Sequence, residues 1–248
     1  MSEIIYLANC ALFIESQGTS LLIDGLFKDD NPFDRIEPFV EHSIVNATGR
    51  YSHIDGLLFT HCHEDHFDKE KVNTFINNHP ETTLLVPEVP ESKGVHHGKE
   101  TPSHEWIKGD LWEHKTVTIG SLSVTFIKTG HISYDYEEHY CILVDNGQES
   151  ILVTGDMELS DLSRLGEIPN LERCTAFFNP IVLGKPSWVE ILADLKFKNI
   201  LIYHIPSEKK DAYGYRKMAI KNFQRVESHL PHGRLLLDPM ERITTSYM

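Results

Sequence analysis

Short apolar runs separated by turn-forming residues recur along the chain, and their length is typical of β-strands. They cover residues 4–7, 11–14, 21–23, 57–59, 84–86, 117–119, 122–127, 140–144, 151–153, 176–178 and 200–203. Between them, helices are predicted over about 69–77, 188–195 and 216–230, the last with apolar positions at Met218, Phe223, Val226 and Leu230. Asp68 stands where it can cap the first helix. The pattern predicts an α/β fold in which helices cover two sheets.

Two long segments, residues 29–55 and 87–106, show neither a helical nor an extended pattern. One interpretation is two surface loops. The other is that they cover a pocket, because long loops in compact domains often act as lids.

With 248 residues, the chain has the length of one sizeable α/β domain, so a single domain over residues 1–248 is predicted.

Charge, cysteine content and the lengths of the apolar runs bear on the partners and the location to be expected for the protein. Lys and Arg number 23 against 37 Asp and Glu, giving a net charge of −14 that would repel a phosphate backbone. The four cysteines form no Cys-x-x-Cys pair and are interpreted as buried or free thiols. The uncharged stretch 4–14 lacks the basic segment of a signal peptide, and no apolar run approaches the ~20 residues of a membrane span. We therefore expect a cytoplasmic protein with a small-molecule substrate and no nucleic-acid or membrane partner.

The sequence His-Cys-His-Glu-Asp-His at residues 61–66 directly follows a predicted strand. Alternate side chains of an extended backbone share a face, so His61 and His63 can grip one cation together. The turn toward the next helix lets Asp65 and His66 reach a neighbouring cation. This hexapeptide therefore predicts the start of two metal sites, whereas a cluster of surface histidines without ligand function is the plainer alternative.

The hexapeptide resembles the His-x-His-x-Asp-His signature of the metallo-β-lactamase superfamily. The other positions of that family pattern have matches in the same order: Asp24 in Leu-Leu-Ile-Asp-Gly, His131 in Thr-Gly-His, Asp156 in Thr-Gly-Asp and His204 in Ile-Tyr-His. Each match follows an apolar run, at the strand ends where ligands gather in layered α/β proteins. The resemblance covers about residues 24–204 and implies a four-layer αββα sandwich.

The same resemblance implies a ligand set for two divalent cations: His61, His63 and His131 for one, Asp65, His66 and His204 for the other, and Asp156 bridging them. Imidazole and carboxylate donors without thiolate suit Zn²⁺, the metal expected here, and also Mn²⁺ or Fe, because donor type alone does not separate these metals. Asp24 is interpreted as a partner that orients a ligand histidine, or else as a strand-end turn residue. The implied reaction is hydrolysis by a hydroxide between the cations, with Asp65 and Asp156 as the catalytic carboxylates.

Within the superfamily, the chain is most similar to the compact cytosolic branch that includes the ascorbate-phosphate lactonase-like group. That likeness implies cleavage of an ester-like, lactone or phosphoester bond of a small molecule. An iron-dependent oxidoreductase similar to the persulfide dioxygenases, or a nuclease or phosphodiesterase, is the alternative enzyme. A non-catalytic binding module would be expected to have lost ligands, and none of the seven is missing.

Several other polar residues have competing interpretations. His139, His114 and His104 are rivals of His131 for its place in the ligand set. Asp145 precedes Asn146-Gly147 and is interpreted as a turn residue. Possible substrate contacts, each with ordinary packing or a solvated charge as the more common alternative, are Tyr134, Tyr136, Tyr213, Tyr215, Lys209 and Lys210. His96 and His97 are interpreted as solvated residues of the segment 87–106.

Overall fold

The computed structural model describes residues 2–29, 32–95, 104–133 and 138–245. Its strands are β1 (Ser2–Ala8), β2 (Ala11–Ser16), β3 (Thr19–Ile23), β4 (Gly56–Leu58), β5 (Thr83–Pro87), β6 (His104–Ile107), β7 (His114–Ile119), β8 (Leu122–Thr129), β9 (His139–Asp145), β10 (Ser150–Val153), β11 (Cys174–Phe178), β12 (Asn199–Ile202), β13 (Gly233–Leu235) and β14 (Glu241–Thr244). Its α-helices are α1 (Pro38–Val45), α2 (Lys69–Asn78), α3 (Pro186–Leu195) and α4 (Tyr215–Val226). Short 3₁₀ helices are η1 (Gly49–Tyr51), η2 (Leu162–Glu167), η3 (Leu171–Arg173), η4 (Pro180–Gly184) and η5 (Glu227–His229). Every predicted apolar run overlaps a strand, so those predictions are confirmed.

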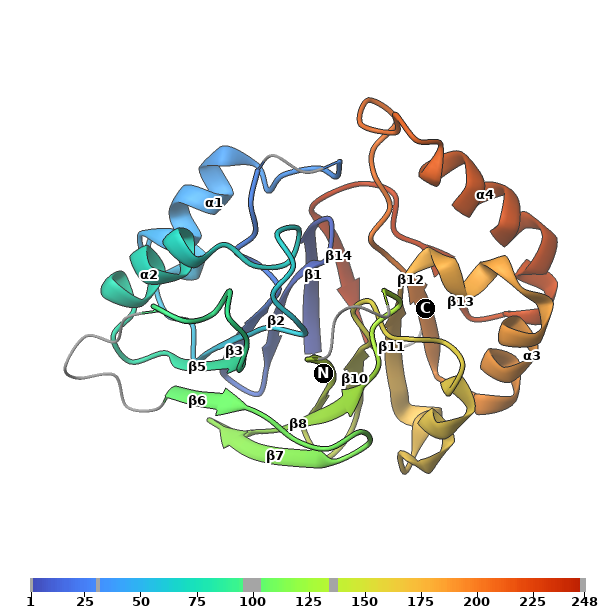
Figure 1. Ribbon diagram of the computed structural model, residues 1–248, viewed down its shortest axis with the longest axis horizontal. Coiled ribbons are helices and arrows are strands. Elements are labelled where there is room, and N and C mark those ends of the chain that lie inside the picture. Colours follow the sequence, from blue (N-terminus) through green and yellow to red (C-terminus); the bar gives the residue numbers. More distant parts are fainter. Residues whose placement is uncertain (1, 30–31, 96–103, 134–137, 246–248) are drawn as a thin grey trace.

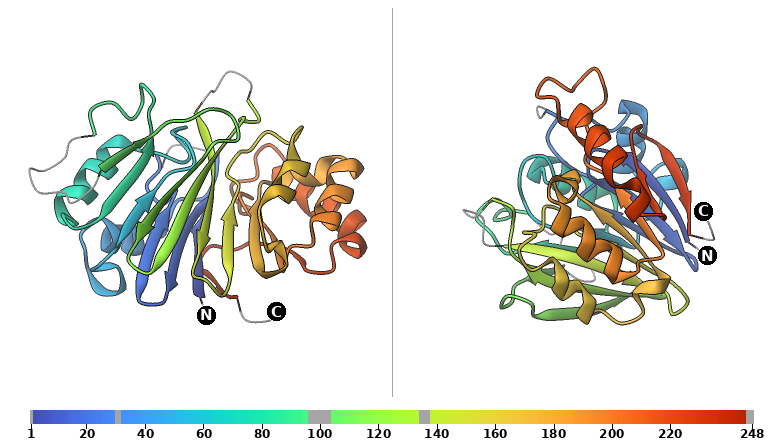
Figure 2. Two further views of the ribbon diagram at one scale, coloured as in Figure 1. Left: turned by 90° about the horizontal axis from the view of Figure 1, so that it is seen from below. Right: turned by 90° about the vertical axis from the view of Figure 1, so that its right-hand side faces the viewer.

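The strands form two seven-stranded mixed sheets. The first sheet has the order β14-β1-β2-β3-β4-β5-β6, and the second has the order β13-β12-β11-β10-β9-β8-β7. Helices α1 and α2 lie on the outer side of the first sheet, and α3 and α4 on the outer side of the second (Figure 1). The view from below shows the two sheets facing each other between these helices (Figure 2).

Three apolar layers hold this arrangement together, and the two-residue period of the strands distributes side chains among them. Ile14 packs between the sheets, whereas its neighbour Phe13 packs in the layer under α1 and α2. In the second sheet, Ile142 packs between the sheets and its neighbour Cys141 packs in the layer under α3 and α4. Both faces of each sheet are therefore covered, which confirms the predicted αββα sandwich.

Local sequence explains one helix that was predicted and one that was missed. The Asp68 carboxylate accepts hydrogen bonds from the backbone N–H groups of Glu70 and Lys71 at 2.8 and 3.1 Å, as expected for the N-cap of α2. The prediction that residues 29–55 lack regular structure is wrong, because α1 and η1 lie within them. Helix α1 was missed because it buries few residues and leaves Phe39 82% exposed, so no apolar stripe marks it.

Other departures from the predicted elements lie near the edges of the sheets. Strand β6 falls at the end of the segment 87–106, and β13 and β14 lack the apolar runs that marked the other strands. Helix α4 differs from its prediction in one apolar position. Met218 was expected on the buried face but is 45% exposed, and Ala219 is buried instead. The helix also ends at Val226, before Leu230.

The parallel strands carry the predicted site residues at their carboxyl ends. Strands β3 and β4 pair in parallel in the first sheet, and β10, β11 and β12 do so in the second. Asp24 directly follows β3, and the hexapeptide comes just after β4. Asp156 and His204 follow β10 and β12 in the same way. Because parallel strands end at a common edge, residues far apart in sequence meet there.

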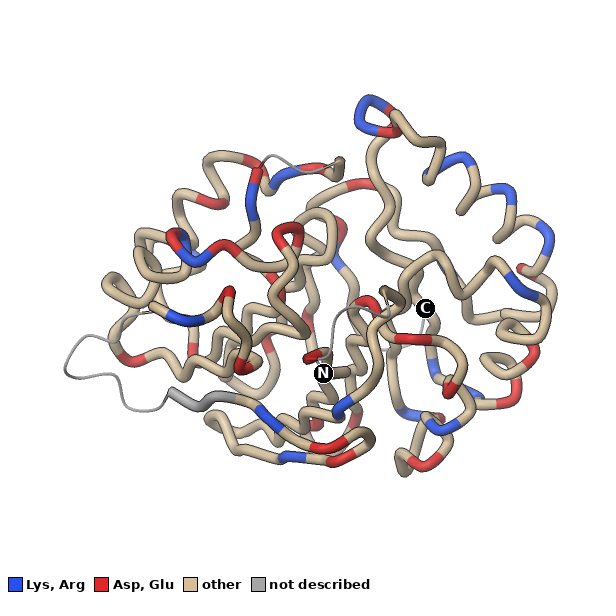
Figure 3. Tube along the Cα trace, in the orientation of Figure 1, with Lys and Arg blue, Asp and Glu red and all other residues tan. Residues whose placement is uncertain are grey.

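Thiols, helix length and charge distribution can be compared with what the composition predicted. All four cysteines are buried thiols. Among the helices of the described residues, none combines the length and apolarity needed to cross a bilayer. Lys and Arg gather along α4, which carries four of them and no Asp or Glu, while acidic residues are spread over the rest of the fold (Figure 3).

Candidate metal centre

The structure brings all seven predicted ligand residues together where the ends of the two sheets meet. In each of three groups, the potential ligand atoms lie within 4.8 Å of one another. The first triad is His61, His63 and His131; the second triad is Asp65, His66 and His204; and a third group joins His61, His66 and Asp156. The first and the second triad are therefore adjacent, because the third group takes His61 from one and His66 from the other.

Asp156 stands between the two triads and faces histidines of both. Its Oδ2 atom lies 3.8 Å from the Nε2 atoms of His66 and of His131, and its Oδ1 atom lies 3.6 Å from His204 Nε2. These distances exceed those of hydrogen bonds. They are close to the ~3.4 Å between two ligand atoms that each lie about 2.0–2.1 Å from a tetrahedral zinc ion. The spacing therefore fits ligands of shared cations.

Asp24 lies behind the second triad and contacts it through His66. Its Oδ2 atom lies 2.9 Å from His66 Nδ1, while Thr60 donates its backbone N–H to Oδ1 at 2.8 Å and its hydroxyl to Oδ2 at 2.6 Å. Among the described residues, the buried His66 Nε2 atom has no hydrogen-bond partner. A carboxylate that accepts a hydrogen bond from Nδ1–H leaves the opposite nitrogen, Nε2, available for a metal, so the pair fits metal binding.

Of the histidines weighed for the first triad, it is His131 that lies with His61 and His63. Its ring centroid is 4.8 Å from that of His61 and 4.5 Å from that of His63, and its Nδ1 atom faces the backbone N and O of Ser133 at 2.8 and 3.3 Å. His139 is buried beside His61, at 5.2 Å between ring centroids, but the described groups of converging ligand atoms do not include it. His114 is exposed on β7, and the side chain of His104 lies outside the described part of the chain.

Burial and neighbouring charges set the protonation of the centre. Burial lowers the pKa of His61 and His139 well below its usual value and lowers the pKa of His131 to about 4. Burial opposes ionisation of Asp156, but the neighbouring imidazole of His204 outweighs it and holds the pKa of this carboxyl well below its usual range. At neutral pH the first triad thus presents neutral imidazoles beside a carboxylate, the forms that bind metal.

The overall architecture matches a solved structure over nearly its whole length. The metallo-β-lactamase fold protein YhfI from Bacillus subtilis aligns with 98% of this chain and 100% of its own, with a TM-score of 0.68 and 12% identity. The chain has the metallo-β-lactamase fold. The centre described above lies where the two sheets of that fold meet.

Two further solved structures align with nearly all of this chain. An isothiocyanate hydrolase from Delia radicum gut bacteria aligns over 98% of both chains, with a TM-score of 0.69 and 11% identity. The diiron β-hydroxylase CmlA from Streptomyces venezuelae aligns over 98% of this chain and 54% of its own, with a TM-score of 0.66 and 17% identity. Comparisons with protein-family models and with curated proteins gave no match.

Several residues around the metallo-β-lactamase-fold centre were missed by the sequence analysis. Asn179, directly after β11, donates from Nδ2 to Asp156 Oδ1 at 2.7 Å. The strand-end rule that found Asp156 would also have found Asn179, because it too follows an apolar run. The ring of Phe33 lies 4.1 Å from that of His204, and Asp34 accepts the Ser207 backbone N–H at 2.5 Å. No local signal marks Phe33, which comes from the segment 29–55.

Other residues singled out from the sequence lie apart from these contacts or outside the described residues. Asp145 accepts the Gly147 backbone N–H at 2.6 Å, so its interpretation as a turn residue is confirmed. Tyr213 and Tyr215 are 72% and 42% exposed before and at the start of α4. Lys209 and Lys210 are exposed as well, and Tyr134, Tyr136, His96 and His97 lie outside the described residues.

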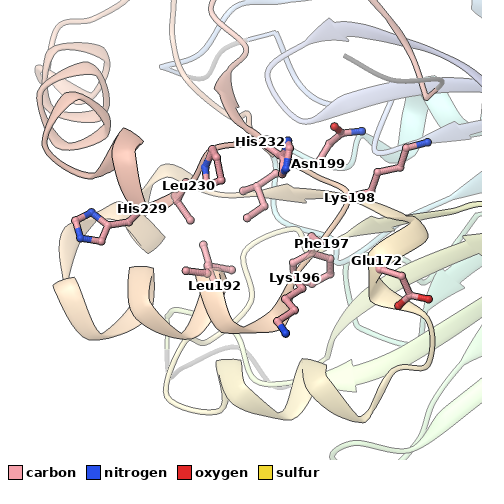
Figure 4. A pocket seen from close by; sticks show the side chains of 12 residues that line it. Glu172, Leu192, Lys196, Phe197, Lys198, Asn199, His229, Leu230 and His232 are labelled. Carbon is pink, nitrogen blue, oxygen red and sulfur yellow. The ribbon is translucent and has the colours of Figure 1, made fainter.

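A cavity of about 430 Å³ lies at the other end of β12 from His204. Leu192, Phe197 and Leu230 gather around it, with Asn199 and His232 at one side (Figure 4). Its lining includes none of the predicted ligands. This cavity is therefore separate from the metal centre.

The lowered histidine pKa values predict acid destabilisation of the chelator-treated protein. Unfolded histidines titrate near 6.5, whereas folded His131 titrates at about 4, so the unfolded chain binds more protons between these values. The free energy of unfolding should therefore fall from pH 6.5 to pH 5, with His131 alone contributing about 2 kcal/mol. Burial opposes protonation of His66, but Cys10 and Asp24 outweigh it and raise the pKa of His66 well above its usual value. The contribution of His66 to the free energy of unfolding therefore changes only above pH 6.5.

Urea unfolding of the metal-free protein at the two pH values measures this difference. The matched variant His131→Gln should show a smaller difference, because it removes one of the depressed groups. Equal free energies of unfolding at both pH values would contradict the prediction.

Proposed function

We propose that the protein is a metal-dependent hydrolase that cleaves an ester-like, lactone or phosphoester bond of a small molecule. The observation that carries the proposal is the position of Asp156, whose two carboxylate oxygens face histidines of both triads at 3.6–3.8 Å. The isothiocyanate hydrolase with the same fold supports hydrolysis as a reaction for this scaffold. The bond cleaved here follows from the resemblance to the lactonase-like branch and is part of the proposal.

In this proposal, the first triad and the second triad would each hold one divalent cation, and Asp156 would serve both. We propose Zn²⁺ ahead of Mn²⁺ or Fe, because the imidazole-rich donors of the two triads and Asp156 are those of catalytic zinc sites. When bound, paired cations lower the pKa of water and polarise the bond under attack.

The chain's own residues would orient this chemistry. Asp24 holds the Nδ1 side of His66, which keeps Nε2 directed toward Asp156. Asn179 fixes the Asp156 carboxylate by a hydrogen bond to Oδ1. Asp65 has 24% of its side chain exposed and lies 3.5 Å from His204 Nε2, so it is the carboxylate placed to exchange a proton with a substrate.

The second candidate is iron-dependent oxidation. The diiron β-hydroxylase CmlA has the same fold, and imidazole and carboxylate donors suit iron. Cleavage of a phosphodiester is the alternative within hydrolysis that follows from the family resemblance.

Metal reconstitution coupled to an activity screen tests the proposal. Protein stripped by a chelator is reloaded with Zn²⁺, Mn²⁺ or anaerobic Fe²⁺, and its metal content is measured by elemental analysis. Lactones, thioesters, phosphodiesters and β-lactams are then assayed together with oxygen uptake. We expect about two cations per chain and hydrolysis that chelation abolishes. Oxygen consumption with bound iron and no hydrolysis would favour the oxidoreductase, and absence of any bound metal would refute both.

A further inference from the structure

The turn between β1 and β2 is buried although it is the tip of a β-hairpin. Asn9 and Cys10 form this turn and are 1% and 0% exposed. Turns that join strands normally lie at the surface, where water satisfies their polar groups. Asn9 also has a φ of +52°, a left-handed conformation that Asn tolerates better than most residues. A buried polar turn in this conformation needs specific partners.

Those partners are the backbones of two residues of the second triad. Asn9 Nδ2 donates to the carbonyl oxygen of Asp65 at 2.7 Å. The carbonyl oxygen of Asn9 accepts the backbone N–H of His204 at 3.0 Å and the hydroxyl of Tyr6, also at 3.0 Å. Asp65 belongs to the hexapeptide that follows the first sheet's β4, whereas His204 follows β12 of the second sheet. One residue therefore connects ligands delivered by both sheets.

The backbone of His204 needs such support. Its φ of +60° lies in the left-handed region, which is strained for a residue with a β-carbon. The hydrogen bond from its N–H to Asn9 contributes to holding this conformation, which directs the imidazole toward Asp65 and Asp156 at 3.5 and 3.6 Å. The first triad has no comparable link to this turn among the described hydrogen bonds.

We infer that Asn9 is a positioning residue for the second triad. It sets the metal affinity of this triad by fixing the backbones of Asp65 and His204 relative to each other across the two sheets. The inference rests on the proposed function, because it requires that the second triad binds a cation. Residues that orient ligands typically change metal affinity by about 10–100-fold when they are replaced. The effect should be confined to the second triad, because the contacts of Asn9 reach Asp65 and His204 and not the first triad.

The substitution Asn9→Gly tests this inference, because glycine adopts the turn's positive φ readily and only the side-chain amide is lost. Gln17→Gly is the matched control, since Gln17 has a φ of +50° in the exposed turn between β2 and β3. The nearly isosteric Asn9→Asp, which replaces the amide donor with an acceptor, is the second variant. Zn²⁺ affinities are measured by competition with a chromophoric chelator, and imidazole ¹⁵N shifts report which histidines bind.

For Asn9→Gly and Asn9→Asp we expect the Zn²⁺ affinity of the second triad, followed at His66 and His204, to fall about 10–100-fold. The step followed at His61 and His131 should stay within about threefold of the parent, and Gln17→Gly should match the parent at both. Unchanged affinity at His66 and His204, or an equal loss at both triads, would overturn the inference. If the parent itself bound no Zn²⁺, the proposed function would fail instead, so the two failures are distinguishable.

Discussion

Asp156→Asn is expected to reduce bound metal from about two cations per chain to one or fewer and to lower hydrolysis by more than about 10³-fold. The substitution keeps the size of the side chain and removes its charge. In the parent, both carboxylate oxygens face imidazole nitrogens at 3.6–3.8 Å, and the pKa of the group lies well below its usual range. Without the anion, two cations would repel each other with no shared ligand between them.

Asp145→Asn is the matched control for this experiment. Asp145 also ends a strand of the second sheet, but it accepts a turn N–H and pairs with Arg173 at 2.8 Å, away from the triads. Metal content by elemental analysis and turnover of the best substrate from the screen are measured for both variants and the parent. Asp156→Asn protein with parental metal content and turnover would refute the assignment of Asp156 as the shared ligand.

Gly155→Ala is expected to destabilise the protein by about 3 kcal/mol and to impair metal binding as well. Gly155 has a φ of +53°, where a β-carbon is strained. A β-carbon there would also lie 2.8 Å from His139 Nε2 and 2.8 Å from Thr60 Oγ1. Thr60 hydrogen-bonds Asp24, and Gly155 directly precedes Asp156, so the clash would displace both sides of the centre.

Gly147→Ala separates backbone strain from the clash. Gly147 has a φ of +85°, but a β-carbon there would meet no atom within 4 Å. Its substitution should therefore cost only about 1 kcal/mol in urea unfolding and leave metal content unchanged. Similar losses of stability for the two variants would show that the close packing of Gly155 against Thr60 and His139 is unimportant.

Residues with a strong local signal were predictable from the sequence. The hexapeptide at residues 61–66 combines a strand end, alternating imidazoles and a capped helix, all of which are local properties. Asp156 and His204 followed from their positions after apolar runs together with the family resemblance. Asn179 obeys the same rule and was missed because an amide is a less conspicuous ligand partner than a carboxylate.

Residues that depend on long-range packing were not predictable. No local pattern marked Asn9, because its carbonyl meets the backbone N–H of His204 only when the second sheet packs against the first. The buried His139 was a reasonable rival of His131, because the sequence does not say which histidine points at His63. Helix α1 left no apolar stripe, so its position also emerged only in three dimensions.

The sequence by itself determined eleven of the fourteen strands that the structure describes, three of its four α-helices and the covering of two sheets by helices, because short-range periodicity encodes these features. The αββα layering and the full donor set of the centre came from the family resemblance. Only the tertiary structure decided between the two interpretations of Asp24, placed the Asp156 oxygens 3.6–3.8 Å from histidines of both triads, and put the buried turn at Asn9 between ligands from opposite sheets. Such contacts depend on how two sheets pack face to face, and that packing brings together residues too distant in the chain for any local pattern to relate them.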